Sequence, residues 1–268
     1  MTMLKLSSSV AQLFFTGRMM QFFFVLLLGV ITYLFYQYGK AGRTWEIRPL
    51  EGLDAVEEGI GRSAEMGRSI LVLPGISNLQ NAQTVAGLTM YGEVTERAAK
   101  IGIDTHTIMT STEAVTVAEA IARDAFQRAG RPEMYSPGQY VRWYGGGQFV
   151  YAVGAAGHIM EMKPALLIYM GYFLADVIVT AETGSRVGAV SIGSTTDQSA
   201  TPLMGMFCDY LLIGEEMYAA SAEITRDPLA IATLAGEDWM KILLLGLMVV
   251  GVLANMVGNN FIWTLLGM

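Results

Sequence analysis

Residues 20–38 form a run of 19 amino acids without a charged side chain, "MQFFFVLLLGVITYLFYQY". A helix of this length rises 1.5 Å per residue and covers roughly the 30 Å core of a bilayer. Tyr33, Tyr36 and Tyr38 gather at one end, as expected for an interfacial aromatic belt. The run is long for a signal peptide, and "YQYGKAGR" lacks a small-residue cleavage site. We therefore predict an uncleaved transmembrane helix at 20–38, after an N-terminal segment at 1–19.

A second charge-free run covers residues 242–268 and begins "ILLLGLMVVGVLANMV". We predict a second transmembrane helix at 242–258, followed by an interfacial tail at 259–268. The tail either continues the helix or lies at the membrane surface, where Trp263 would be stable. Asn255, Asn259 and Asn260 would then either be solvated or form hydrogen bonds between helices.

Basic residues predict the orientation of both spans. Lys40, Arg43 and Arg48 follow the first span, and Lys5 and Arg18 precede it. The second span is preceded by Arg226 and Lys241, and no basic residue follows it in the sequence. Because positive charge favours the cytoplasmic side, both spans direct the middle of the chain to the cytoplasm. We predict a bacterial or archaeal cytoplasmic membrane as the location.

The composition supports burial of a large apolar area. Of the 268 residues, 53% are hydrophobic and only 15% are charged, against about 25% charged in typical soluble domains. The net charge of −7 argues against a nucleic-acid partner. The single cysteine, Cys208, excludes an intrachain disulfide and a cysteine-cluster metal site.

Between the two spans, short apolar runs alternate with amphipathic segments of about a dozen residues. Strands are predicted at 69–75, 105–111, 139–147, 165–171 and 189–195, and helices at 50–66, 82–102, 113–130, 148–162 and 172–184. This alternation predicts parallel βαβ units with right-handed crossovers. We therefore predict an α/β domain over 45–238, with a Rossmann-like, mostly parallel sheet covered by helices on both faces.

Asp209, Glu215 and Glu216 interrupt the apolar stretch "CDYLLIGEEMYAASAEI" at 208–224. A short helix begins at Thr201-Pro202 and either continues to Glu223 or ends near Asp209. In the second interpretation, which we favour, 209–214 is a sixth strand and a new helix begins at Glu215, because Gly214 disfavours a helix interior. Both interpretations exclude a transmembrane span here, since a charge at mid-bilayer costs at least about 2.5 kcal/mol.

Two short motifs carry a resemblance to a known family. The AEMGR turn at Ala64–Arg68 and the GEE-x-YAA-x-A pattern at Gly214–Ala222 resemble a family of prokaryotic membrane proteins known only as a domain of unknown function. The resemblance would cover most of 45–240. It implies a membrane protein and brings no activity, cofactor or catalytic residue.

The loops after the predicted strands are the candidate ligand-binding positions, because ligands of open parallel sheets bind beyond the carboxyl ends of the strands. Hydroxyls and glycine amides suit anions there, and the candidates are Gly145, Gly146, Gly147, Ser194 and Thr195. The glycine turn departs from G-x-G-x-x-G because position 150 is valine, and no G-x-x-x-x-G-K-[ST] occurs. The alternative is that these residues only form tight turns and helix caps.

Three carboxylates are further candidates. Glu182, Glu215 and Glu216 could bind a divalent metal or act as acid and base, or they could serve only at helix ends. The two histidines, His106 and His158, form no metal motif and are interpreted as structural. We predict no metal and no cofactor.

The sequence contains no complete catalytic motif, and it has 18 methionines and a small-residue helix, "AVGAAG" at 152–157. Methionine adapts to irregular contacts and small residues allow close helix approach. We therefore expect a non-enzymatic scaffold or accessory subunit that self-associates or joins a larger membrane complex. The alternative is a sensor or enzyme that binds a small ligand or nucleotide with its strand-end loops.

Overall fold

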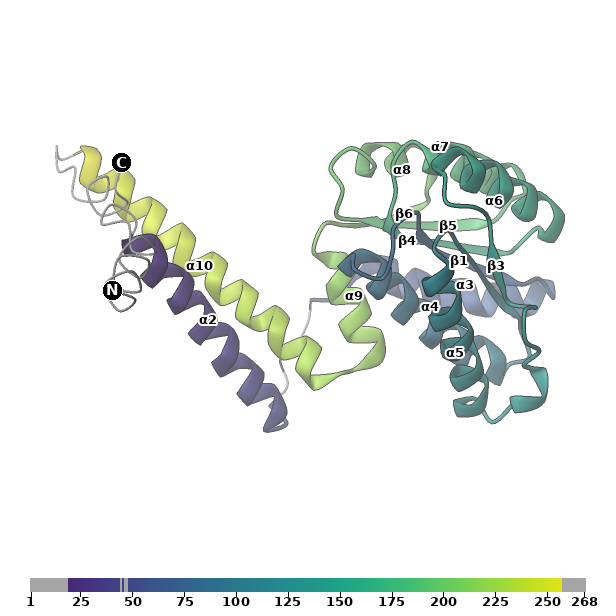
Figure 1. The fold of residues 1–268 in the computed structure, drawn as a ribbon, viewed down its shortest axis with the longest axis horizontal. Coiled ribbons are helices and arrows are strands. Elements are labelled where there is room, and N and C mark those ends of the chain that lie inside the picture. Colours follow the sequence, from purple (N-terminus) through teal and green to yellow (C-terminus); the bar gives the residue numbers. More distant parts are fainter. Residues whose placement is uncertain (1–18, 44, 46–47, 257–268) are drawn as a thin grey trace, which may run out of the picture. The chain divides into compact units, whose positions relative to one another are not determined.

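The computed structural model describes residues 19–43, 45 and 48–256 (Figure 1). The chain divides into two compact units: Ile47–Arg226 is one, and the described residues before and after it form the other. Most of the predicted N-terminal segment at 1–19 and all of the tail at 259–268 lie outside the described residues.

The helical unit consists of two long helices, α2 (Met19–Lys40) and α10 (Pro228–Met256), which lie side by side (Figure 1). They run antiparallel, because Gly39 meets Ala232, Phe35 meets Gly236 and Thr32 reaches Met240. A Cβ atom placed on Gly39 would lie only 2.6 Å from the Ala232 Cβ. Glycine at positions 39 and 236 therefore allows the two backbones to approach closely.

One helix among the described residues is long and apolar enough to cross a membrane, Phe22–Lys40 within α2. By the same test no C-terminal span is evident in the described part of the chain, although one was predicted at 242–258. The helix α10 carries Glu237, Asp238 and Lys241 before its apolar stretch, and the structure describes this helix only as far as Met256. Because α10 begins at Pro228, residues 228–238 belong to this long helix, although the sequence suggested that they were part of the α/β domain.

The other unit is an α/β fold with six parallel strands in the order β3-β2-β1-β4-β5-β6. The strands are β1 (Ile70–Gly75), β2 (Thr105–Met109), β3 (Val141–Trp143), β4 (Leu166–Tyr172), β5 (Val190–Thr195) and β6 (Tyr210–Ile213). The helices are α3 (Glu51–Met66), α4 (Ala82–Lys100), α5 (Thr112–Arg128), α6 (Gln148–Met162), α7 (Asp176–Arg186), α8 (Thr201–Phe207) and α9 (Glu216–Thr225), with a 3₁₀ turn, η2, at Pro132–Met134. The predicted α/β class and parallel sheet are therefore confirmed.

Helices cover both faces of the sheet: α3, α4, α5 and α9 pack on one face, and α6, α7 and α8 on the other (Figure 1). Along β1, Ile70 and Val72 face the first layer of helices, whereas Leu71 and Leu73 face the second. Since successive strand residues point to opposite faces, both sides need apolar residues. This explains why the strands read as unbroken apolar runs.

The acidic stretch near 209 contains a strand, as the favoured interpretation predicted. Asp209 lies just before β6, and its carboxylate accepts hydrogen bonds from the Ser191 backbone N–H (2.8 Å) and hydroxyl (2.9 Å). Gly214 follows β6 with a φ of 62°, a left-handed conformation that glycine adopts without strain. The carboxylates therefore mark the two ends of a short edge strand.

The strand order reverses between β1 and β4, which is where open α/β sheets commonly bind ligands. Here the two strands stay paired to their ends, and the Ile76 N–H donates to the Tyr172 carbonyl at 2.9 Å. Glycine makes this possible: a Cβ atom on Gly87 would collide with the Met170 carbonyl, and one on Gly171 with the Pro74 carbonyl. Backbone atoms therefore pack against each other at this point.

Candidate functional site

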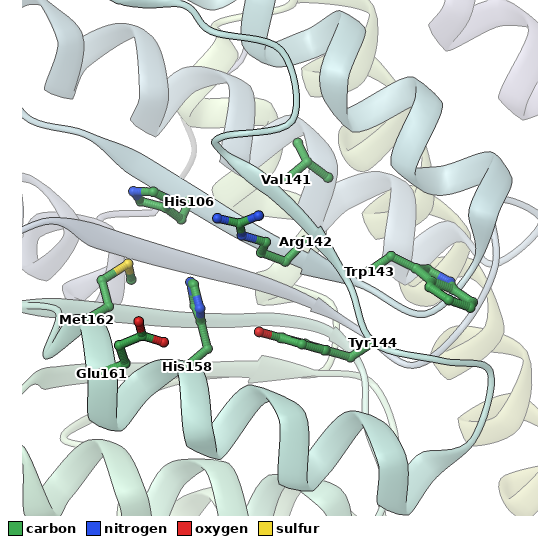
Figure 2. Close-up of a pocket in the computed structure, with 8 residues that line it drawn as sticks. All are labelled: His106, Val141, Arg142, Trp143, Tyr144, His158, Glu161 and Met162. Carbon is green, nitrogen blue, oxygen red and sulfur yellow. The ribbon is translucent and has the colours of Figure 1, made fainter.

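A pocket of about 580 Å³ lies beside β2, β3 and α6, near one edge of the sheet (Figure 2). Its walls come from three elements and are rich in polar and aromatic side chains: His106 from β2; Val141, Arg142 and Trp143 from β3, with Tyr144 just after it; and His158, Glu161 and Met162 from α6. A volume of this size is typical of small-molecule sites.

The two histidines of the chain meet in this pocket. The ring centroids of His106 and His158 are 6.1 Å apart, and His158 also lies 6.3 Å from the Tyr144 ring. Figure 2 shows His158 rising from α6 toward the space next to His106 and the Arg142 guanidinium. Crossover geometry explains the meeting: α6 leaves β3 at the edge and crosses β2 on its way to β4 at the centre.

Local packing positions the other side chains of the pocket. The Trp143 indole N–H donates to the Thr110 carbonyl at 2.8 Å, which ties β3 to the end of β2. The Tyr144 ring rests against Gly154 of α6, where a Cβ atom would lie 2.7 Å from the ring carbon Cγ. The Arg142 guanidinium makes a long contact, 3.4 Å, with the Gly138 carbonyl. Arg142 is exposed and can turn toward a ligand.

Each histidine has one buried ring nitrogen without a hydrogen-bond partner among the described residues, Nδ1 of His106 and Nε2 of His158. Burial of the ring, together with the nearby His158 and Arg142, lowers the pKa of His106 to about 4, against the opposing influence of Asp104. Burial and Arg142 also lower the pKa of His158, and Glu161 acts in the opposite direction. Both imidazoles are therefore neutral at neutral pH, beside a permanent positive charge.

The residues predicted as a ligand site lie in separate places. Gly145, Gly146 and Gly147 connect β3 to α6 at one side of the sheet, whereas Ser194 and Thr195 end β5 near the other. Gly147 is the residue before α6, and Gly145 has a φ of 54°. Three strands separate the two groups, so they do not line one pocket.

Two of the predicted hydroxyls are buried. Thr195 donates a hydrogen bond to the Gln83 side-chain oxygen at 3.1 Å, and the Thr196 N–H donates to the same oxygen at 3.0 Å. These contacts link β5 to the start of α4. Ser194 is 1% exposed, and its hydroxyl finds no partner within the described part of the chain.

The predicted carboxylates have structural contacts. Glu216 pairs with Arg48 and accepts a hydrogen bond from the Ile213 N–H at 3.1 Å. Glu215 is the residue before α9, so it lies at the positive end of that helix. Glu182 pairs with Arg186 on the same helix, α7, at 2.6 Å. Glu182 is therefore on a different element from the other two.

The pocket of His106 and His158 was not recognised from the sequence, which only suggested that each histidine is structural. The two positions belong to different elements, and no motif links them. Among the described residues, no group of three or more histidine, cysteine or acidic side chains is placed to hold a metal ion. The chemistry of the pocket is that of a cation and several hydrogen-bond donors next to one carboxylate, Glu161.

Comparison with known proteins supports a family assignment. A family model described as a domain of unknown function, DUF6754, matches residues 9–266. No curated protein and no solved structure matches the chain. The match covers nearly the whole sequence and includes both resembling motifs, at Ala64–Arg68 and Gly214–Ala222. The chain therefore belongs to the DUF6754 family, whose function is unknown.

Proposed function

We propose that this protein is a membrane-anchored, non-enzymatic α/β subunit that assembles with copies of itself. The observation that carries the proposal is an exposed apolar surface on α6. Four of its side chains are strongly exposed, although all are apolar: Phe149 (76%), Val150 (60%), Val153 (69%) and Met160 (61%). A row of large apolar side chains on one helix is typical of a surface that a partner covers.

The shape of this α6 surface favours a second copy as the partner. Phe149, Val153 and Met160 project around Gly157, where a Cβ atom would have no described atom within 4 Å. Projecting side chains beside a small residue make a surface that is complementary to itself, as a two-fold interface requires.

The membrane anchor is proposed from the helical unit. The apolar residues of α2 are mostly exposed, among them Phe23 (56%), Val25 (68%) and Leu26 (51%), and lipid would remove them from water. We propose α10 as the second anchor, since it pairs with α2 and carries no charged residue from Ile242 to its described end. The basic residues Lys40, Arg43 and Lys241 support our proposal that the α/β unit lies on the cytoplasmic side of a prokaryotic membrane, following the positive-inside rule.

The test is the mass of the detergent-solubilised chain by light scattering. We expect an oligomer for the wild type and a monomer for Val153→Lys, because the new charge would be buried at the contact. Val85→Lys is the matched control, since Val85 is an exposed valine (47%) on α4, across the sheet. A monomeric wild type, or equal masses for the wild type and Val153→Lys, would contradict self-assembly through α6.

A ligand-binding role is the alternative function, and the pocket of His106 and His158 is the observation that favours it. This pocket lies beside the sheet, so it differs from the strand-end site that the sequence suggested. A thermal-shift screen of the full chain with nucleotides, metals and acyl ligands would test that alternative directly. A shift abolished by Arg142→Gln would support ligand binding in this pocket.

A further inference from the structure

We propose that the pocket between β2, β3 and α6 binds a small molecule through an oxyanion group, a phosphate or a carboxylate, held by Arg142, His106 and His158. This inference does not depend on self-assembly, because it concerns the interior of the pocket and not the exposed surface of α6.

The first support is the donor chemistry of the walls. Arg142 has five N–H donors and no acceptor, and its planar guanidinium matches an oxyanion in a bidentate geometry. Each imidazole can place its proton on the ring nitrogen that faces a ligand, and Tyr144 adds a hydroxyl donor. Four side chains with donors therefore surround one space, which Figure 2 shows beside the Arg142 guanidinium.

The second support is the unmet hydrogen-bonding capacity of the pair. Nδ1 of His106 and Nε2 of His158 are buried from water and lack partners among the described residues, whereas such groups are normally satisfied, so a ligand would reach them once the rings turn toward the pocket. The electrostatics of the pocket also favour an anion, because the positive charge of Arg142 disfavours a proton on either histidine ring. A bound oxyanion would offset that charge, so each ring could gain a proton and become a stronger donor.

The size and remaining walls of the pocket indicate the class of ligand. The volume of about 580 Å³ exceeds what an oxyanion alone would fill, and Trp143, Tyr144 and Met162 supply aromatic and apolar surface for an organic body. Glu161 is the one carboxylate of the wall. It would repel the oxyanion and accept a hydrogen bond from a hydroxyl or amine of the ligand.

Because the chain contains only two histidines, the ring of each one can be followed separately in a single experiment. Histidine-labelled full-length protein in detergent gives two sets of ring signals by NMR, one for each wall of the pocket. We would titrate it with inorganic phosphate and, separately, with acetate, at constant ionic strength set with chloride. We expect both histidines to shift saturably with at least one of the two probes, and their pKa values to rise on binding. The tighter probe identifies which oxyanion the site prefers.

Three substitutions complete the test. Arg142→Gln should weaken binding at least tenfold, whereas Glu161→Gln should tighten it by removing the repelling charge. Arg123→Gln is the matched control: it removes the same charge from an exposed position on α5, which packs on the opposite face of the sheet, and should leave affinity unchanged. Arg142→Lys, which keeps the charge but not the planar fork, should lie between wild type and Arg142→Gln. Non-saturating shifts with both probes, or equal losses in Arg142→Gln and Arg123→Gln, would overturn the proposal.

Discussion

The imidazole ring of His106 on β2 lies 6.1 Å, centroid to centroid, from that of His158 on α6. The two rings share a pocket with Arg142, and both are held in an environment that disfavours their charged forms. This relationship gives the first of four predictions.

The stability of the protein should depend on the titration of His106. Its folded pKa is about 4, below the ordinary value of 6.5, so between these pH values the unfolded chain binds a proton that the folded chain does not. The stability of the protein is therefore at its full value above pH 6.5 and decreases as the pH falls toward 4, by an amount on the order of 3 kcal/mol.

The measurement for this prediction is the thermal midpoint of the full chain between pH 7 and 4, compared with that of His106→Gln. The groups around His106 are His158, Arg142 and Asp104, with the Gln139 backbone as a hydrogen-bond partner. The variant should show a smaller decrease in midpoint over this range. Identical pH profiles for the two proteins would show that His106 is not the group responsible.

Replacement of Gly87 by alanine should destabilise the α/β unit. The added methyl group would collide with the Met170 carbonyl, where α4 packs against β4, and relief requires a backbone shift. We expect a loss of about 1–3 kcal/mol. Gly61→Ala is the control: Gly61 is exposed in α3 with no described atom within 4 Å of the added Cβ, so alanine should stabilise by about 0.5–1 kcal/mol. Chemical unfolding of both variants checks the opposite signs.

Glu216 should prove to be a structural residue of the β6–α9 connection. Its side chain accepts the Ile213 N–H and pairs with Arg48, whose side chain is 76% exposed. Since an exposed ion pair contributes little, most of the expected loss of about 1 kcal/mol in Glu216→Ala comes from the hydrogen bond. Arg48→Ala should therefore cost much less, and equal losses measured by thermal unfolding would contradict this division.

The antiparallel pairing of α2 and α10 should be detectable by cross-linking. In a Cys208→Ser background, Phe35→Cys with Gly236→Cys should form a disulfide under mild oxidation, because a Cβ atom at position 236 would lie 3.2 Å from the Phe35 Cβ, near the separation that a disulfide requires. Phe35→Cys with Leu243→Cys is the control, since the second position lies seven residues further along α10, about 10 Å away. A disulfide in the control at equal yield would contradict the register.

The α/β class and the six-strand sheet were predictable because local physics determines them. Buried strands such as Leu166–Tyr172 must be apolar on both faces, and the helices between them must be amphipathic. The alternation of strands and helices can therefore be recognised from the spacing of apolar residues. The ends of the strands and helices were predicted less accurately than their order. β4 continues to Tyr172 and α7 begins only at Asp176, whereas a helix was predicted from 172, because apolar residues such as Phe173 suit a strand end as well as a helix.

The sequence alone therefore determined the kind of fold and the membrane-length helix at the N-terminal side, and it favoured the sixth strand after Asp209 over a continuous helix. Only the tertiary structure decided the strand order, which brings β3 to the edge and carries α6 back across β2. That crossover joins His106 to His158 and separates Gly145 from Thr195. Residues distant in the chain become neighbours through strand order and crossover path, which depend on the packing of the whole sheet, and no local pattern of residue types encodes them.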